Sequence, residues 1–286
     1  MGRFTGVWIA SDFDNTMADT QAALKEGGKR PELSERNRAA LEYFMAEGGI
    51  FSVSTGRSIP SFEVVRSQIP MNGPTILFNG AATYDYKNEK YICTAFLPEE
   101  VRGHIRQVLH QFPLAACEIY HEDKTIHVLQ PNRWTQEHMH LTHSKAIPVE
   151  QVEQVPAPLS KILFETDPDL LNQVKDYVIH QPWGADYEVV HSSDYLLEVT
   201  AKGATKGGMV QRLGDLMGIV PQHRYCIGDY SNDVDMLRHS AIPFAPANAV
   251  EEIRHLPGIC LLPPCWENTM EAMVEVLKER YPEKNF

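Results

Sequence analysis

Short apolar segments alternate with amphipathic segments in the first eighty residues of the chain. The apolar segments cover residues 7–10, 50–54 and 75–78 and are short enough for buried strands. Between the first two, apolar residues at helical spacing predict a helix that Ser34 caps and that ends at Gly48. A shorter helix is expected over residues 61–68. Strands that alternate with helices at this spacing predict βαβ units and a parallel sheet.

The pattern changes after about residue 83. A hairpin is expected from residues 84–86 and 91–96. Further strands are expected at residues 116–120, 125–129, 161–166, 187–190 and 196–200, and helices at residues 98–111 and 167–180. Antiparallel strands with few helices indicate a separate α+β unit. We therefore predict an inserted cap domain over residues 84–200.

The first pattern returns after Gly203. Helices are expected over residues 206–217 and 234–239, and strands at residues 225–227, 242–245 and 259–262. Met270, Met273, Val274 and Leu277 form the apolar face of a last helix. We therefore expect residues 1–83 and 201–286 to form one α/β domain, a parallel sheet core with helices on both faces.

Composition and charge narrow the class of protein. The 286 residues are 43% hydrophobic and 22% charged, as in ordinary soluble globular proteins. Lys and Arg number 26 against 38 Asp and Glu, and the net charge of −12 argues against nucleic acid as the main partner. We expect no membrane partner, since no run approaches the roughly 18 apolar residues of a span. Five cysteines without a Cys-x-x-Cys pair favour a reduced, cytoplasmic protein, and nothing in the sequence specifies an oligomeric state.

Two carboxylates, Asp12 and Asp14, follow the first predicted strand. An unpaired buried charge is expensive, so carboxylates at the end of a buried strand need a cation. The carboxyl ends of strands in an open α/β sheet also form the crevice where ligands bind. Taken alone, the pair is equally consistent with a solvated turn.

Polar residues follow two more predicted strands. Thr55 follows the second strand, whereas Asp229, Asn232 and Asp233 follow the strand at 225–227, and Lys206 begins a helix. Mg²⁺ prefers oxygen ligands, and Asp12 and Asp229 are the natural carboxylate ligands. Asp12 would then attack a phosphorus atom while Asp14 acts as general acid and base. Individually, Lys206 also fits an ordinary first-turn lysine, and Thr55 and Asp233 fit helix caps.

Five short motifs occur in one order along the chain. They are Asp12-Phe13-Asp14-Asn15-Thr16, Ser54-Thr55-Gly56-Arg57, Asn79-Gly80-Ala81, Lys206-Gly207 and Gly228-Asp229-Tyr230-Ser231-Asn232-Asp233. In this order they resemble the motifs of the haloacid-dehalogenase-like phosphatase superfamily, specifically its Cof-like branch with an α/β cap. Asn15, where glycine is common, and residues 244–249 depart from the family pattern.

The resemblance implies a Rossmann-like core and a phosphoric monoester hydrolase that acts on small phosphorylated metabolites, with sugar phosphates expected. By this resemblance Asp12 is the nucleophile that forms an aspartyl-phosphate, and Asp14 is the acid/base. Mg²⁺ would be bound by the carboxylates of Asp12 and Asp229 and by the backbone carbonyl of Asp14. Asp233, which we include in the metal site, or Asn232 would hold Lys206 or a metal-bound water. The expected substrate-binding residues are Thr55, Gly56, Arg57, Asn79, Lys206 and Asn232.

Two other functions are considered. A phosphomutase or phosphotransferase would pass the same phosphoryl group to a second hydroxyl, so release of inorganic phosphate distinguishes it from a phosphatase. A non-catalytic phosphometabolite-binding protein would be expected to lack Asp12 or Asp14, and both are present.

Substrate specificity is expected in the cap. Arg133, Trp134 and His121 are polar or aromatic candidates there, although solvation of a helix face or loop also accounts for each. His138, His140 and His143 suggest a zinc site, but no carboxylate or cysteine at matching spacing supports one. A polar helix face is the preferred interpretation of these three histidines.

Overall fold

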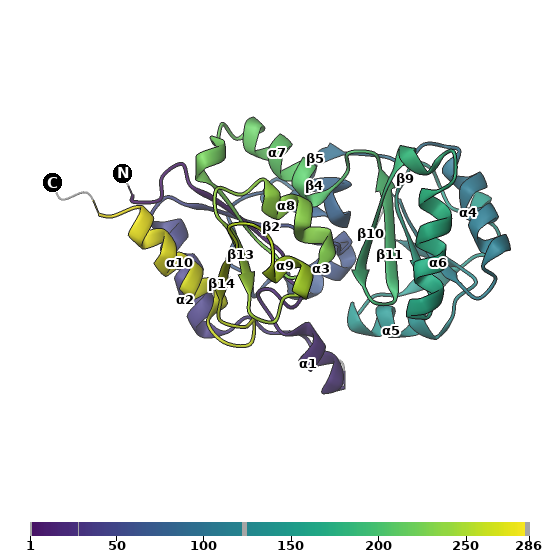
Figure 1. Ribbon diagram of the computed structural model, residues 1–286, viewed down its shortest axis with the longest axis horizontal. Helices are drawn as coiled ribbons and strands as arrows, with labels where there is room; N and C mark the ends of the chain where they lie inside the picture. Colours follow the sequence, from purple (N-terminus) through teal and green to yellow (C-terminus); the bar gives the residue numbers. More distant parts are fainter. Residues whose placement is uncertain (1, 28, 122–124, 284–286) are drawn as a thin grey trace.

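A five-stranded parallel sheet forms the centre of the first of two units (Figure 1). The computed structural model describes residues 2–27, 29–121 and 125–283. The strand order is β14-β13-β12-β1-β2, and every neighbouring pair is parallel. The strands are β1 (Trp8–Ser11), β2 (Ile50–Val53), β12 (Arg224–Ile227), β13 (Pro243–Pro246) and β14 (Cys260–Leu262). The predicted parallel sheet is confirmed, except that the third predicted strand, at residues 75–78, lies in a separate antiparallel sheet.

Helices cover both faces of this sheet, as the sequence predicted (Figure 1). Successive side chains of a strand point to opposite faces. Ile9 belongs to an apolar cluster with α2 (Glu35–Ala46) and α10 (Thr269–Arg280). Trp8 and Ala10 belong to a second cluster with α7 (Lys206–Leu216) and α8 (Val234–Arg238). The described part of this unit also contains the helices α1 (Thr20–Lys25), α3 (Ile59–Arg66) and α9 (Glu251–Arg254).

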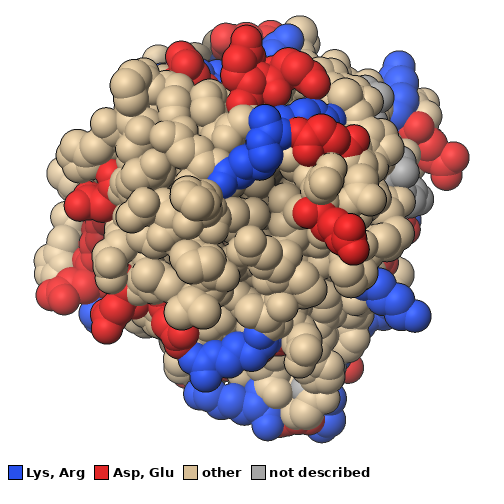
Figure 2. All heavy atoms as spheres, turned by 90° about the vertical axis from the view of Figure 1, so that its right-hand side faces the viewer, with Lys and Arg blue, Asp and Glu red and all other residues tan. Residues whose placement is uncertain are grey.

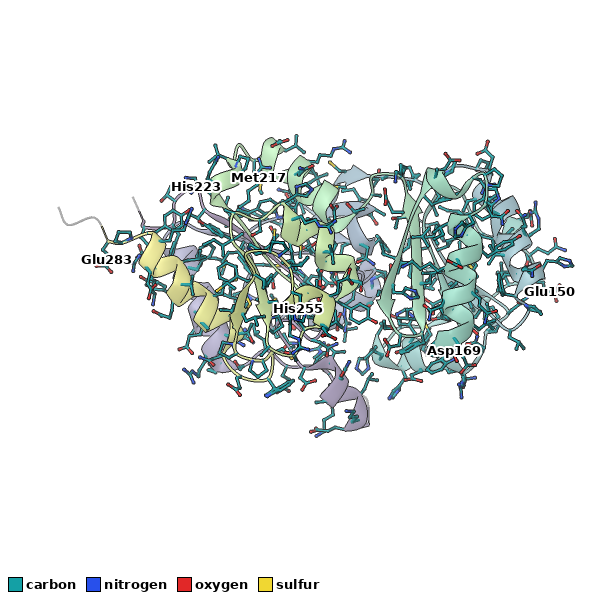
Figure 3. All side chains as sticks on the ribbon, in the orientation of Figure 1. Glu150, Asp169, Met217, His223, His255 and Glu283 are labelled. Carbon is teal, nitrogen blue, oxygen red and sulfur yellow. The ribbon has the colours of Figure 1, made fainter. Side chains whose placement is uncertain are left out.

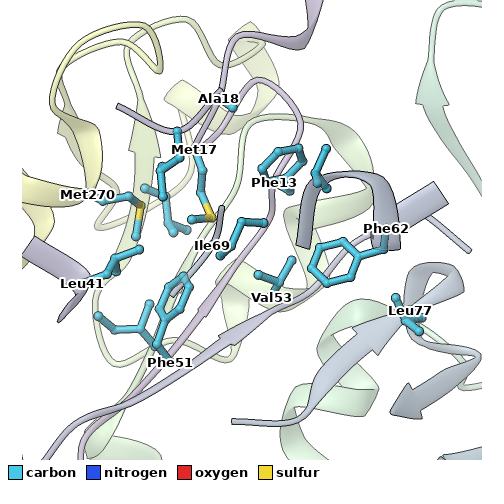
Figure 4. Close-up of a cluster of buried hydrophobic side chains, with 14 of the residues drawn as sticks. Phe13, Met17, Ala18, Leu41, Phe51, Val53, Phe62, Ile69, Leu77 and Met270 are labelled. Carbon is cyan, nitrogen blue, oxygen red and sulfur yellow. The ribbon is translucent and has the colours of Figure 1, made fainter. Parts of the chain in front are cut away.

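Phe13 fixes the turn that carries the two N-terminal carboxylates. Its side chain is fully buried in the apolar cluster that Figure 4 shows, which also contains Met17, Leu41 and Phe62. Burying an aromatic side chain of this size stabilises the fold by roughly 1.5–3 kcal/mol. Because Phe13 is anchored in the core, Asp12 and Asp14 on either side of it are held at the end of β1.

A small antiparallel sheet joins the first unit to the rest of the chain. It consists of β3 (Thr75–Leu77), β4 (Ala82–Asp85) and β5 (Lys90–Thr94). The amide of Thr55, just beyond β2, donates to the carbonyl of Ile76 in β3. Strands β4 and β5 form the predicted hairpin, which pairs with β3 and not with the sheet of the second unit. The predicted cap boundary at residue 84 falls within β4 and stays a prediction.

The second unit, called the cap unit here, contains a six-stranded sheet in the order β10-β11-β9-β6-β7-β8. Its neighbouring strands are antiparallel except for the parallel pair β7 and β8. The strands are β6 (Ala116–His121), β7 (Ile126–Leu129), β8 (Ala146–Pro148), β9 (Leu159–Glu165), β10 (Tyr187–Ser193) and β11 (Leu196–Ala201). The helices are α4 (Val101–Gln111), α5 (Arg133–Leu141) and α6 (Pro168–Ile179). The predicted α+β character is confirmed.

The two faces of the cap sheet have different partners. Ile119 and Phe164 pack with residues of α4 and α6. The alternate residues Tyr120 and Leu163 belong to the apolar cluster of the first unit. In Figure 3, Glu150 lies at the outer end of the cap unit and Glu283 at the opposite end of the molecule. One face of the cap sheet is therefore turned toward the first unit.

The surface of the cap unit carries charges of both signs. Figure 2 views this end of the molecule and shows Lys, Arg, Asp and Glu side chains around a broad uncharged centre. Lys and Arg form no continuous basic surface on this face. Within the described part of the chain, no helix has the length and apolar character needed to cross a bilayer.

Candidate active site

Asp12 and Lys206 form a buried ion pair at the end of the parallel sheet. Asp12 follows β1, and its amide donates to the carbonyl of Ile227 in β12. Lys206 is the first residue of α7, where the hydroxyl of Thr205 caps the helix. The Lys206 Nζ donates to Oδ1 of Asp12 and to Oδ1 of Asp233, both at 2.7 Å. The Lys206 side chain is fully buried, so its charge acts on these two carboxylates.

Asp233 also holds the turn that presents Asp229. Its Oδ2 accepts hydrogen bonds from the backbone amides of Asp229 at 3.0 Å and Tyr230 at 3.2 Å. Both oxygens of Asp233 are thus engaged, one by Lys206 and one by the turn. Oδ1 of Asp229 accepts a 2.8 Å hydrogen bond from Thr16. Asp233 therefore has the contacts of a positioning residue, and its direct ligation of a metal stays a prediction.

The site has the charge and the ligand atoms expected for a divalent cation. Carboxylate oxygens of Asp12, Asp229 and Asp233 all lie within 4.8 Å of one another. With all three carboxylates ionised, the single ammonium of Lys206 would leave two negative charges uncompensated in a buried site. Burial raises the pKa of Asp12 to about 7, although Lys206 lowers it. Burial, together with the nearby Asp12, also raises the pKa of Asp229. An all-oxygen site with this charge suits Mg²⁺.

Arg57 holds Asp14 through both carboxylate oxygens. Arg57 Nε donates to Oδ2 at 2.8 Å and Nη2 donates to Oδ1 at 2.7 Å, while Thr20 donates to Oδ1 at 2.6 Å. Although burial raises it, Arg57 brings the pKa of Asp14 below its usual range. Asp14 is therefore ionised at neutral pH, the state of a general base. The predicted contact of Arg57 with substrate stays a prediction, because here Arg57 binds Asp14.

The remaining predicted substrate-binding residues surround this centre. Asn232 Nδ2 donates to Oδ1 of Asn79 at 3.0 Å. Asn79 has a φ of +54°, a left-handed conformation that asparagine tolerates better than most residues. The hydroxyl of Thr55 accepts from the amide of Arg57 at 3.1 Å. A Cβ on Gly56 would lie 2.9 Å from Oε1 of Glu198 in the cap unit, so glycine permits this close approach.

A cavity of about 430 Å³ brings most of these residues to one surface. Its lining includes the predicted site residues Asp12, Asp14, Thr55, Gly56, Arg57, Asp229 and Asn232. Lys206, Asn79 and Asp233 do not line the cavity and lie behind it, where they contact residues that do.

Comparison with known proteins identifies the family. The sequence model of the haloacid dehalogenase-like hydrolase family matches residues 9–256. The chain belongs to this family. The 5-amino-6-(5-phospho-D-ribitylamino)uracil phosphatase YwtE of Bacillus subtilis is 25% identical over 274 residues, which cover 86% of this chain and 89% of that protein. The HMP-PP phosphatase of Cronobacter sakazakii is 24% identical over 240 residues, covering 80% and 84%.

Solved structures of this hydrolase family share the fold. The sugar phosphatase BT4131 of HAD subclass IIB aligns with a TM-score of 0.78 at 22% identity and covers 95% of this chain and 98% of its own. A haloacid dehalogenase-like hydrolase from B. subtilis aligns with a TM-score of 0.80 at 19% identity, covering 94% and 99%. The α/β core with an additional cap unit is therefore the fold of this family.

The cap unit of this hydrolase supplies the opposite wall of the cavity. Lys161 Nζ donates to the carbonyl oxygen of Gly56 at 3.0 Å and pairs with Glu198 at 2.8 Å. Tyr120, which also lines the cavity, lies with its ring 4.5 Å from the Lys161 ammonium. Sequence analysis missed these residues. Their signal is a charged or polar residue at alternate positions of strands that are otherwise apolar and completely buried.

The cap residues named from the sequence lie elsewhere. Arg133 is largely exposed and pairs with Asp167, and Trp134 stacks on the ring of Tyr195 at 4.6 Å. Neither these two residues nor His121 is part of the cavity lining. His140 and His143 are exposed, as expected for a polar helix face.

His138 requires a correction. It is largely enclosed between Glu118 and Glu165, and it lines the cavity. A polar helix face is therefore the wrong interpretation of this residue. Its carboxylate partners come from β6 and β9, so the spacing along the sequence could not reveal them.

Proposed function

We propose that this hydrolase is a Mg²⁺-dependent phosphatase that cleaves phosphate monoesters of small metabolites, with sugar phosphates as the substrate class. The observation that carries the proposal is the Asp12 carboxylate, held by Lys206 on the wall of a cavity and next to Asp229. The relatives named above as phosphatases of phosphorylated metabolites, and the sugar phosphatase with the same fold, support it.

In the proposed reaction Asp12 is the nucleophile. Its free carboxylate oxygen attacks phosphorus, so that a bond to Asp12 forms while the bond to the leaving oxygen breaks. Lys206 favours the ionised form of Asp12, opposing the effect of burial, and orients the group through the 2.7 Å contact with the other oxygen. Water then attacks the phosphorus of the aspartyl-phosphate and releases inorganic phosphate. Asp12 is restored as a carboxylate.

Asp14 handles the protons of both steps. The ionised Asp14 of the structure is ready to take a proton from the attacking water. For the first step it must carry a proton to the leaving oxygen. A dianionic phosphate placed beside it favours protonation, because a like charge raises the pKa of a carboxyl group. Arg57 limits this effect and orients both oxygens.

Mg²⁺ would be held by the carboxylates of Asp12 and Asp229 and the backbone carbonyl of Asp14. When bound, it neutralises charge on the phosphoryl oxygens during transfer. Asp233 keeps Lys206 and the amides of the Asp229 turn in place for this arrangement.

The cap unit closes the site against water. Tyr230 of the first unit donates a 2.8 Å hydrogen bond to Asp194 of the cap unit, and Lys161 reaches the carbonyl of Gly56. All four residues line the cavity. Excluding bulk water strengthens the electrostatic contacts around the reacting phosphoryl group.

A phosphate-release screen over a panel of phosphorylated metabolites tests the proposal. We expect inorganic phosphate from the wild type with Mg²⁺ and none from the Asp12→Asn variant, which retains the shape of the side chain. Mass spectrometry of the products separates the alternative, since a phosphomutase or phosphotransferase yields a new phosphate ester without inorganic phosphate. Phosphate release at the wild-type rate by Asp12→Asn would refute the nucleophile assignment.

A further inference from the structure

A second group of buried charges lies in the cap unit, away from Asp12. The side chains of Glu118 in β6 and Glu165 in β9 are fully buried on the sheet face that is turned toward the first unit. His138 of α5 enters between them. Its Nδ1 lies 3.1 Å from both oxygens of Glu118 and 3.4 Å from Oε1 of Glu165. The three side chains are called the cap triad below.

The outer oxygens of the cap triad are also satisfied. Tyr120 donates to Oε2 of Glu118 at 2.5 Å, and Thr135 donates to Oε2 of Glu165 at 2.6 Å. These bonds fix both carboxylates and leave their remaining oxygens for the histidine. The orientation of the imidazole ring is therefore set by two strands and by its own helix.

His138 carries a positive charge in this environment. Although burial lowers it, the carboxylates of Glu118 and Glu165 raise the pKa of His138 to about 10. The position in the last turn of α5 favours the cation further, because the C-terminal end of a helix is electronegative. Both ring nitrogens of the imidazolium are donors, and the carboxylates use only Nδ1.

The Nε2 side of the ring is available to a ligand. The His138 side chain is 12% exposed and forms part of the cavity wall. Within the described part of the chain, Nε2 has no hydrogen-bond partner, and it is not completely buried. A buried cation with one satisfied and one accessible donor is arranged to bind an acceptor from the cavity.

We propose that His138 is a substrate-binding residue that donates a hydrogen bond from Nε2 to an uncharged hydroxyl or carbonyl oxygen of the leaving group. Glu118 and Glu165 are its positioning residues. The proposal rests on the proposed function, because the ligand is the alcohol portion of the phosphate ester. To the proposed function it adds the residue that recognises this portion. It also adds that the leaving group carries no charge of its own.

The charge of the cavity selects against an anionic leaving group. On the cap side, Glu137, Asp194 and Glu198 line the cavity, and Lys161 is paired with Glu198. His138 in the wall faces Glu118 and Glu165, and burial raises the pKa of Glu165 to about 7. A second phosphate or a carboxylate at this position would meet excess negative charge. A hydroxyl group accepts from His138 and donates to the acidic side chains, so a polyhydroxylated leaving group fits both.

Substrate comparison with a matched variant tests the inference. Four probes are used with the wild type: ribose 5-phosphate, sorbitol 6-phosphate, fructose 1,6-bisphosphate and phenyl phosphate. Ribose 5-phosphate and sorbitol 6-phosphate are called the polyol monophosphates here because their leaving groups carry several hydroxyls. For whichever of the two is hydrolysed faster, we expect His138→Gln to lower kcat/KM by about 10-fold or more, mainly through a higher KM. Phenyl phosphate has no hydroxyl for His138, so its kcat/KM should change less than about twofold. His140→Gln, on the exposed side of the same helix, is the control and should leave kcat/KM for both substrates unchanged.

Several outcomes would overturn the inference. An equal loss for phenyl phosphate and the polyol phosphate would indicate a purely structural role. An unchanged KM for the polyol phosphate, or a preference for fructose 1,6-bisphosphate or phenyl phosphate over both polyol monophosphates, would also contradict it. Elemental analysis could instead find a metal ion that the wild type binds and Glu118→Gln loses. His138 would then be a metal ligand and not an imidazolium, which would contradict the inference. No hydrolysis of any probe would instead refute the proposed function.

A second measurement does not depend on the folding of His138→Gln. A crystal structure of the Asp12→Asn variant with sorbitol 6-phosphate should place a sorbitol oxygen within hydrogen-bond distance of His138 Nε2. A sorbitol portion bound with no oxygen near His138 would contradict the assignment.

Discussion

Lys206 Nζ lies 2.7 Å from Oδ1 of Asp12, although 194 positions separate the two residues in sequence. The contact joins the end of the first strand to the start of α7, and a third group, Asp233, holds the same ammonium from the other side. Burial raises the pKa of Asp12 to about 7, and the neighbouring ammonium favours its ionised form and orients it for attack. The account of the function depends on this pair.

Replacing Lys206 by methionine should abolish activity and weaken the fold. Methionine has a similar length but leaves Asp12 and Asp233 without their shared cation. Removing one partner of a buried ion pair costs about 3–5 kcal/mol. Urea unfolding with EDTA present measures this loss. Lys202→Met is the control, because Lys202 forms an exposed pair with Glu188 and should cost less than about 1 kcal/mol. Equal stability of the two variants would contradict the role of Lys206.

Removal of divalent cations should silence the enzyme, and Mg²⁺ should restore it. The reason is the excess of two negative charges among Asp12, Asp229, Asp233 and Lys206. Titration of activity with Mg²⁺ after chelation measures the requirement. Asp229→Asn should raise the Mg²⁺ concentration needed for half activity by at least about tenfold, and Asp215→Asn, at an exposed carboxylate, should not. Full activity in EDTA would contradict the metal site.

Gly80 should be required for the approach of Lys206 to the site. Gly80 has a φ of +102°, and a Cβ there would lie 2.1 Å from the carbonyl oxygen of Thr205, immediately before Lys206. We expect Gly80→Ala to reduce both thermal stability and kcat. Gly27→Ala is the matched control, since Gly27 has a φ of +86° but, among the described residues beyond its chain neighbours, nothing lies within 4 Å of an added Cβ. Both variants bear the backbone penalty of roughly 1–2 kcal/mol, and only Gly80→Ala adds a collision. Identical stability and activity of the two would refute the steric explanation.

The sequence predicted which residues meet at the edge of the parallel sheet, for a physical reason. Asp12, Thr55 and Asp229 each follow a short apolar strand, and the carboxyl ends of parallel strands meet at one edge of a sheet. Knowing the strands was therefore enough to bring these residues together. Side chains of an extended segment alternate between its two faces. Phe13 therefore points away from the two carboxylates beside it and is buried as their anchor.

The cap side could not be predicted in the same way. Glu118 and Glu165 lie on two strands of an antiparallel sheet, and their partner His138 lies on a helix between them in sequence. Which face of each strand is turned toward the first unit depends on how the two units pack. Charged residues within apolar strands indicate a buried polar network, but its members are identified only by the pairing of β6 with β9.

The cap triad should make stability depend on pH above neutrality. The pKa of His138 in the fold, about 10, lies above its ordinary value of 6.5. The stabilisation by His138 is therefore complete below about pH 6.5 and is lost as the pH rises through about 10. Urea unfolding of wild type and His138→Gln over this range should show a difference in free energy that shrinks with increasing pH. A difference that stays constant between pH 6.5 and 10 would contradict a charged His138.

The most direct test of the central claim is chemical trapping of phosphorylated Asp12. The Asp14→Asn variant is mixed with p-nitrophenyl phosphate, whose leaving group needs no proton donor, and is quenched in acid. Water attack lacks its general base in this variant, so the intermediate should accumulate. Peptide mass spectrometry should then find one phosphoryl group on the peptide that contains Asp12, at the Asp12 carboxylate. Release of p-nitrophenol by this variant with the Asp12 peptide unmodified, or with the phosphoryl group on another residue, would contradict the account.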